Sequence, residues 1–192
     1  PVERGDHTAG GRPVTVRLVT DSCADLPAAW VRDFGITVVP LHVVQEDDKA
    51  VSTAAVTPDE LAANYADLLA DPDCTGVVSV HLSKELSRTW QSASDAATRF
   101  GGRVLVSDSR GAGMAFGAAV AQCAWAANNG LGLSATYDLA ARLCRGASTY
   151  AALESLEYLR RGGRISALAA IFGSALAMRP VIVLRSGSVD LA

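Results

Sequence analysis

Short β-branched apolar runs alternate with helix-forming segments along most of the chain, and this alternation constrains the fold more than any other feature. Four such runs predict strands, over residues 14–20, 36–44, 76–82 and 103–107. A polar segment follows each run and leads into residues whose apolar side chains recur at helical spacing. Strand–helix alternation predicts a doubly wound, mostly parallel sheet with helices on its faces. The expected fold class is therefore α/β, with a Rossmann-like open parallel sheet.

The segments between the runs carry specific helix signals. Thr57, Pro58 and Glu60 fit the N-cap, N1 and N3 positions of a capping box. Pro27 predicts the start of an earlier helix, and Gly35 predicts its end. Further helices are expected up to about residue 100 and over residues 113–128 and 134–146, and a charged loop is expected over residues 45–50.

The pattern changes after residue 146, which predicts a boundary between two lobes. Residues 1–13 are polar and Gly-rich, and we interpret them as a leader that precedes a Rossmann-like α/β lobe over residues 14–146. Residues 147–192 are expected to form the first part of a second α/β lobe. Its expected elements are strands at 148–153, 180–184 and 188–191, a short helix at 156–161 and an apolar helix at 167–178. No closing element follows, so we interpret the chain as either a truncated copy or an incomplete part of something longer.

Composition argues against several classes of function. The net charge is -3 and there is no basic stripe with interleaved aromatic residues, so nucleic acid is not an expected partner. The four cysteines form no CxxC pair and only three histidines are present, so a zinc site is not expected. No other metal or cofactor is expected either. No apolar run is long enough to predict a transmembrane helix, and no apolar signal region is visible. The cytoplasm is the expected location.

Small hydroxyl and acidic residues follow three of the predicted strands. They lie at residues 20–22, at Ser83 and at residues 107–109. In an open α/β sheet, ligands bind in the crevice at the carboxyl ends of the strands. Hydroxyl groups beside helix N-termini can donate hydrogen bonds to an anion there. The same residue types also serve as ordinary helix caps and turn residues, so both interpretations stay open at this point.

Five collinear blocks resemble the DegV family. Residues 19–27 (VTDSCADLP) are similar to the family's opening VTDSTADLP motif, and residues 39–41 resemble its VPL strand. Residues 82–93 (LSKELSRTWQSA) resemble its SSxLSGTYQSA segment, and residues 106–109 resemble its VxDS step. Residues 156–166 (LEYLRRGGRIS) match its LEYLKKGGRIS signature closely. The resemblance therefore extends over most of the chain.

This resemblance implies a fold and a function. The family has two α/β lobes with one long-chain fatty acid, such as palmitate or oleate, lying between them. It includes the carrier subunit of bacterial fatty acid kinase, which presents the acyl carboxylate to a separate kinase subunit for phosphorylation. The resemblance thus implies a non-catalytic lipid carrier with a fatty acid as its ligand and a kinase as its partner.

The resemblance also implies which residues hold the carboxylate. Ser87 occupies the position of the family serine in LSGT. Thr53 is the simplest match for a threonine in a TSxPSP-like segment, with Ser52 and Thr57 as alternatives. Thr57 is favoured as a plain helix cap.

Five further positions are candidates for the lipid site. Arg88 replaces the family glycine after the binding serine, and it either pairs with the carboxylate or points to solvent. Arg164 either bridges the lobes or contacts the kinase. Phe116 and Ile171 either line the acyl chain or pack in an ordinary core, and Ser109 lies at a strand end.

Enzymatic alternatives have weaker support. Ser87, His81 and Asp108 would form a hydrolase triad acting on a lipid ester, but the chain has no G-x-S-x-G elbow. Cys23 would be a thiol nucleophile, but the neighbouring carboxylates raise the pKa of a thiol and so disfavour the thiolate. A nucleotide-binding module would need a glycine-rich phosphate loop, and none is present.

Overall fold

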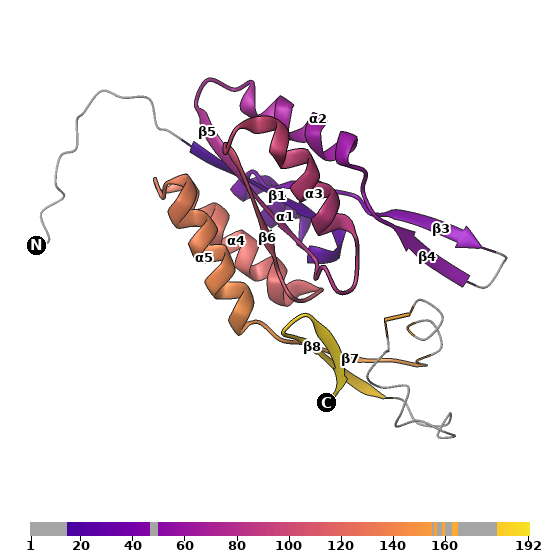
Figure 1. Cartoon of the computed structure of the whole chain (residues 1–192). Helices are drawn as coiled ribbons and strands as arrows, with labels where there is room; N and C mark the ends of the chain where they lie inside the picture. Colours follow the sequence, from indigo (N-terminus) through magenta and orange to yellow (C-terminus); the bar gives the residue numbers. More distant parts are fainter. Residues whose placement is uncertain (1–14, 47–49, 155, 157–158, 160–162, 165–179) are drawn as a thin grey trace, which may run out of the picture.

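A four-stranded parallel sheet forms the centre of the molecule in the computed structural model, which describes residues 15–46, 50–154, 156, 159, 163–164 and 180–192 (Figure 1). The strands lie in the order β2-β1-β5-β6. Their bounds are Thr15–Asp21 for β1, Thr37–Val39 for β2, Cys74–His81 for β5 and Val104–Asp108 for β6. All pairings in this sheet are parallel, which confirms the predicted α/β class.

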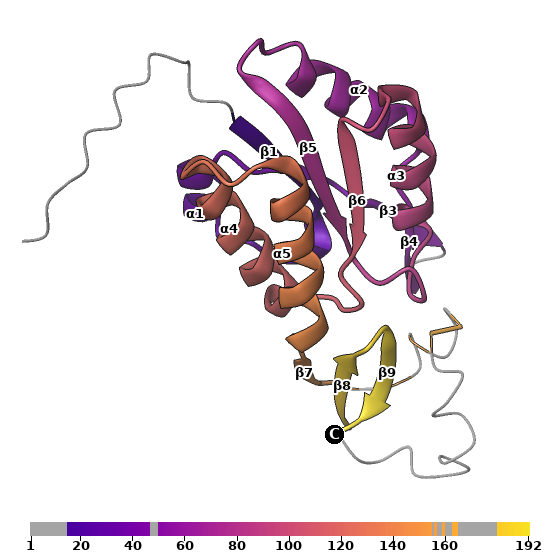
Figure 2. The same cartoon turned by 60° about the vertical axis from the view of Figure 1, so that its left-hand side comes forward.

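Helices cover both faces of this sheet (Figures 1 and 2). On one face lie α1 (Ala28–Phe34), α4 (Met114–Asn128) and α5 (Leu133–Gly146), and on the other lie α2 (Pro58–Leu69) and α3 (Thr89–Ala97). Successive residues of β1 supply the two cores, because side chains alternate across a strand. Leu18 packs in the core that contains Phe116, whereas Val19 packs in the core that contains Tyr65. Residues 77–80 are fully buried because both faces are covered.

A protruding hairpin replaces part of one predicted strand. The run 36–44 was interpreted as a single strand, but Pro40 and Leu41 separate β2 from β3 (His42–Glu46). Proline has no backbone N–H to donate to a ladder, which explains the interruption. β3 pairs antiparallel with β4 (Ala50–Ala54), and the two strands extend away from the central sheet (Figure 1). The prediction of a charged loop over residues 45–50 was therefore wrong at both ends, because residues 45 and 46 belong to β3 and residue 50 belongs to β4.

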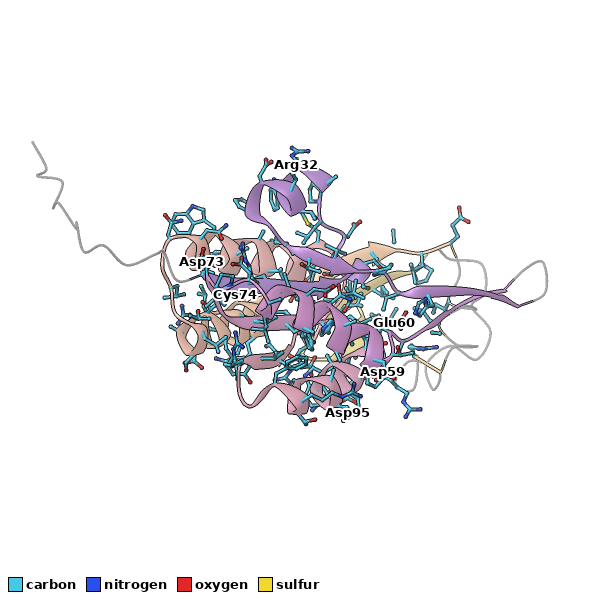
Figure 3. All side chains as sticks on the ribbon, turned by 90° about the horizontal axis from the view of Figure 1, so that it is seen from above. Arg32, Asp59, Glu60, Asp73, Cys74 and Asp95 are labelled. Carbon is cyan, nitrogen blue, oxygen red and sulfur yellow. The ribbon has the colours of Figure 1, made fainter. Side chains whose placement is uncertain are left out.

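The predicted capping box at the start of α2 is confirmed. The Oγ1 atom of Thr57 accepts from the backbone N–H of Glu60 at 3.3 Å, and Oε2 of Glu60 accepts from the backbone N–H of Thr57 at 2.8 Å. The other carboxylate oxygen of Glu60 lies 2.8 Å from Nε2 of His42, which ties the hairpin to α2. Figure 3 shows Asp59 and Glu60 together at this end of α2.

A second, antiparallel sheet follows α5. Its strands are β7 (Thr149–Ala152), β8 (Val181–Arg185) and β9 (Ser188–Leu191), in the order β7-β8-β9. Ile182 and Val189 form its small buried core. The expected leader and the expected helix at 167–178 lie outside the described residues, as does most of the expected helix at 156–161. The division into lobes at residues 14–146 and 147–192 stays a prediction.

Within the part of the chain that the structure describes, no helix is long and apolar enough to cross a bilayer.

Candidate ligand-binding site

The strand order places a topological switch point between β1 and β5. From β1 the chain passes outward to β2 on one side, and the later strands β5 and β6 lie on the other side. The loops that leave the carboxyl ends of β1 and β5 therefore run in opposite directions, and this is the position at which open α/β sheets bind ligands. Asp21 ends β1 and His81 ends β5, so both residues lie at this point.

Asp21 holds the two loops at the switch point together. Its Oδ1 accepts from the backbone N–H of Cys23 at 3.0 Å, and its Oδ2 accepts from the backbone N–H of Leu82 at 2.9 Å. The same Oδ2 lies 3.0 Å from Nδ1 of His81. Asp21 is fully buried, and these contacts supply the hydrogen bonds that a buried carboxylate requires.

A buried polar chain continues from His81 beneath α2. Nε2 of His81 lies 2.8 Å from Oγ of Ser79, and the hydroxyl of Tyr65 donates to the same Oγ at 2.8 Å. Burial raises the pKa of Tyr65 to about 12, so its hydroxyl stays protonated. Nε2 of His81 thus faces Ser79, and Nδ1 faces Asp21. The alternative in which His81 forms a hydrolase triad with Ser87 and Asp108 is therefore wrong.

Ser87 lies immediately before the first turn of α3. Its Oγ accepts from the backbone N–H of Thr89 at 3.2 Å and lies 3.0 Å from the Thr89 hydroxyl. The first α-helical hydrogen bond of α3 runs from the N–H of Ser92 to the carbonyl of Arg88, whose side chain forms no cap. Ser87 is half-buried and Arg88 is exposed. The site therefore combines a hydroxyl with the partial positive charge of a helix N-terminus, which favours an anion.

The threonine candidates occupy two different environments. Thr53 lies on β4, where its backbone pairs with Val43, and Ser52 pairs with Val44. The side chains of Thr53 and Ser52 are outside the described part of the structure, so their role in binding stays a prediction. Thr57 is the N-cap of α2, as the simpler interpretation expected.

The additional candidates are dispersed. Ser109 is buried and its hydroxyl donates to the carbonyl of Gly111 at 3.1 Å, as a turn residue does. Phe116 is buried in the core between α4 and the sheet. Nε of Arg164 donates to the carbonyl of Leu86 at 3.3 Å, next to Ser87 in the chain. Ile171 lies outside the described residues. A lipid-binding role for these four residues and for Arg88 stays a prediction.

The thiol alternative loses support from the environment of Cys23. Burial raises the pKa of this thiol, and the nearby carboxylates of Asp21 and Asp25 raise it further, although a backbone hydrogen bond with Gly113 opposes them. A raised pKa lowers the fraction of nucleophilic thiolate at neutral pH. Among the residues that the structure describes, no three His, Cys, Asp or Glu side chains are grouped so that they could hold a metal ion.

The sequence alone did not predict the polar chain or the hydrogen bond from the hydroxyl of Ser83 to the carbonyl of Gly187. Ser79 and His81 are two residues apart in a predicted strand, so their shared face was visible in the sequence. Asp21, the partner of His81, is 60 residues from it in the chain, and Gly187, the partner of Ser83, is 104 residues from Ser83. No local pattern connects residues at those separations.

Comparisons with known proteins identify the family. The family model described as "Uncharacterised protein, DegV family COG1307" matches residues 44–192. A DegV domain-containing protein of Corynebacterium glutamicum is 38% identical over 178 residues, covering 92% of this chain and 65% of the relative. A relative from Streptomyces coelicolor is 36% identical over 195 residues, covering 91% of this chain and 69% of its own length. The chain thus spans about two thirds of the length of these relatives.

Solved structures of DegV family proteins share the fold of this chain. A DegV family protein from Corynebacterium glutamicum superposes with a TM-score of 0.85 at 37% identity, covering 93% of this chain and 67% of that one. A DegV family protein from Thermus thermophilus, whose structure is described as showing fatty acid binding, superposes with a TM-score of 0.81 at 32% identity, covering 93% of this chain and 70% of that one. The matched family model, the sequence identities and the shared fold establish that this chain belongs to the DegV family.

Proposed function

We propose that this chain binds one long-chain fatty acid, of the palmitate or oleate type, between two lobes and hydrogen-bonds its carboxylate through Ser87 and Thr53. The observation that carries the proposal is the structural likeness to the Thermus thermophilus protein, which is described as binding fatty acid. Family membership and the hydroxyl of Ser87 at the start of α3 support it.

The chemistry around Ser87 suits a carboxylate head group. The Ser87 hydroxyl is a neutral donor, and the N-terminus of α3 adds a partial positive charge without adding a full cation. Arg88 is exposed, which agrees with a side chain that points to solvent. Neutral donors offset the cost of burying the head group and leave its oxygens free to react.

The acyl chain would supply most of the binding free energy. Each buried methylene contributes about 0.8 kcal/mol, so a chain of palmitate length far outweighs one or two hydrogen bonds. Substitution of Ser87 is therefore expected to weaken binding rather than abolish it. Among the candidates for the wall of the acyl site, Phe116 packs beside the sheet, and Ile171 lies outside the described residues.

The chain would act as a carrier and not as an enzyme. We propose that it presents the carboxylate to a separate kinase subunit, as the resemblance implies, and that it does so in the cytoplasm. In the described part of the chain His81 faces Ser79 and Asp21, and this arrangement removes the base that a hydrolase built on Ser87 would need.

Native mass spectrometry tests the proposal directly. Protein purified from bacteria is expected to carry an added mass equal to one fatty acid, and delipidated protein is expected to bind palmitate or oleate. Ser87→Ala should weaken palmitate binding about five-fold, the factor that one ordinary hydrogen bond supplies. Ser148→Ala, which removes an exposed hydroxyl elsewhere, is the matched control. A wild-type protein that binds neither acid would overturn the proposal.

A further inference from the structure

The loop that carries Ser87 is organised around one buried residue, Ser83. The carbonyl of Ser83 accepts from the backbone N–H groups of Leu86 and Ser87, at 2.9 and 3.0 Å. Its hydroxyl oxygen accepts from the backbone N–H of Glu85 at 3.2 Å, and its own N–H donates to the carbonyl of Gly111 at 2.8 Å. Ser83 is fully buried, so the path of the loop up to Ser87 depends on its position.

The hydroxyl of Ser83 makes one further bond, to the other sheet. It donates to the carbonyl of Gly187 at 2.9 Å. Gly187 lies in the two-residue turn between β8 and β9, where both Ser186 and Gly187 have positive φ, as a tight hairpin turn of this type requires. A Cβ atom on Gly187 would lie 3.5 Å from Oγ of Ser83 and 3.4 Å from Cγ of Glu85, so the turn packs directly on the loop.

Two bonds of Arg110 hold the same turn from the other side. The N–H of Gly187 donates to the carbonyl of Arg110 at 2.7 Å, and Nη2 of Arg110 donates to the carbonyl of Ser186 at 3.1 Å. The β8–β9 turn is thus fixed between the loop after β5 and the loop after β6. In Figure 2 the hairpin lies beyond the carboxyl ends of these two strands, where the candidate head-group site is.

The loop also contributes to the core of the antiparallel sheet. The side chain of Leu86 packs against the cluster of Ile182 and Val189, and the carbonyl of Leu86 accepts from Arg164. The segment from Ser83 to Ser87 is therefore shared: it leaves the parallel sheet, packs against the antiparallel sheet and ends at the head-group serine.

From this geometry we infer that Ser83 is a positioning residue that couples the docking of the β8–β9 turn to the conformation of the loop carrying Ser87. Separation of the two sheets would remove the Gly187 bond and loosen the loop in the same event. A bound carboxylate on Ser87 would conversely stabilise the docked turn. The expectation that Ser83 slows the release of a bound fatty acid rests on the proposed function. The coupling between the β8–β9 turn and the loop can be tested without any ligand.

The chain provides a matched control for Ser83. The hydroxyl of Thr149, in β7, donates to the carbonyl of Ala112 at 2.6 Å. It therefore also joins the antiparallel sheet to a loop at the carboxyl end of the parallel sheet, but it makes no bond to the segment from Ser83 to Ser87. Thr149→Val removes this hydroxyl with little change of shape, as Ser83→Ala does for its own.

Two measurements on the full chain test the inference. In hydrogen–deuterium exchange without ligand, Ser83→Ala should accelerate exchange in the 84–87 segment and at Gly187 together, whereas Thr149→Val should leave the 84–87 segment unchanged. Isotope-labelled palmitate should dissociate about five-fold faster from Ser83→Ala, and within two-fold of wild type from Thr149→Val. Unchanged exchange at 84–87 in Ser83→Ala, or equal effects of the two variants, would overturn the coupling. If wild-type protein binds no palmitate, the proposed function fails and the exchange result alone decides on the coupling.

Discussion

The imidazole of His81 is held by the carboxylate of Asp21, with 3.0 Å between Nδ1 and Oδ2. Asp21 also accepts from two backbone N–H groups, and in the arrangement where its Oδ2 accepts from the imidazole as well, the proton of His81 lies on Nδ1. Nε2 is then the acceptor for the hydroxyl of Ser79, which in turn accepts from Tyr65. Every member of this buried chain has a partner, and a fully satisfied polar network gives a single well-defined arrangement of the switch point.

Asp21→Asn is therefore expected to destabilise the protein strongly. An amide of the same shape offers one acceptor oxygen where the carboxylate serves three donors, so at least one buried donor loses its partner. Bonds to charged acceptors contribute about 1.5–3 kcal/mol each, and the free energy of unfolding should fall by about that amount. Urea denaturation followed by circular dichroism measures it. Asp25→Asn is the control, since Asp25 is exposed and asparagine tolerates its positive φ. Equal losses in the two variants would contradict the assigned role of Asp21.

Gly117→Ala should disrupt the packing of α4 on the turn after β1. A Cβ atom at this position would lie 2.0 Å from the carbonyl oxygen of Ala24, so helix and turn would have to move apart. Overpacking of this kind costs about 1–3 kcal/mol. The upper part of this range exceeds the gain of about 1 kcal/mol in helix propensity that alanine has over glycine. Gly146→Ala is the control, because a Cβ atom there meets no other atom within 4 Å. Thermal melting should show a lower midpoint for Gly117→Ala and an unchanged or higher one for Gly146→Ala.

The parallel sheet was predictable because burial on both faces leaves a continuous apolar run in the sequence. Residues 77–80 are an example, since all four are fully buried. The signals for helix ends at Thr57 and Gly35 were also predictable, because each depends only on residues close by in the chain. The hairpin of β3 and β4 was missed although Pro40 interrupts the run. Part of β3 was predicted as a strand, but as a continuation of β2, and its antiparallel pairing with β4 depends on a contact between two segments that the apolar run does not specify.

The contacts around the candidate site were predictable only in part. Ser87 was proposed through the family resemblance, and its role in binding stays a prediction; the structure places it immediately before α3. The contacts of Ser83 with Gly187 and of His81 with Asp21 depend on the register between distant segments. Such contacts are decided by tertiary packing, which a local pattern does not contain.

The capping box of α2 predicts a specific dependence on pH. Hydrogen bonds from the side chain and backbone of Thr57, with a further one from His42, lower the pKa of Glu60 from 4.5 to about 2. Because this pKa is lower in the folded state, the stabilisation is complete above about pH 4.5 and is lost as the pH falls towards 2. The difference in unfolding free energy between wild type and Glu60→Gln should therefore be constant near neutral pH and change below pH 4.5. Glu154→Gln, which alters an exposed residue, is the control. A similar pH profile for this variant would show that the capping box is not the cause of the pH dependence.

Thr57→Ala tests the other half of the same box. Loss of an N-cap hydroxyl costs about 1 kcal/mol, and here it also removes the main partner that lowers the pKa of Glu60. The variant should unfold at a lower urea concentration, and the pKa of Glu60 measured by NMR titration should rise towards 4.5. Thr75→Ala is a suitable control, because Thr75 is also exposed and donates to a single carbonyl within the sheet. An unchanged Glu60 titration in Thr57→Ala would show that His42, and not the cap, dominates the shift.

Cys23 is expected to react slowly with alkylating reagents. Burial is the main cause of its raised pKa, and the negative charge of Asp21 adds to it, so the thiolate is scarce at neutral pH. Iodoacetamide should modify Cys23 more slowly in the folded protein than in urea, where both causes vanish, and the rate should rise with pH above 9. Mass spectrometry of peptic fragments separates Cys23 from Cys74, Cys123 and Cys144, of which Cys123 and Cys144 have pKa values raised to about 12. Fast modification of Cys23 at pH 7 in the folded state would mean that the thiol is more accessible, or more acidic, than its contacts with the switch point imply.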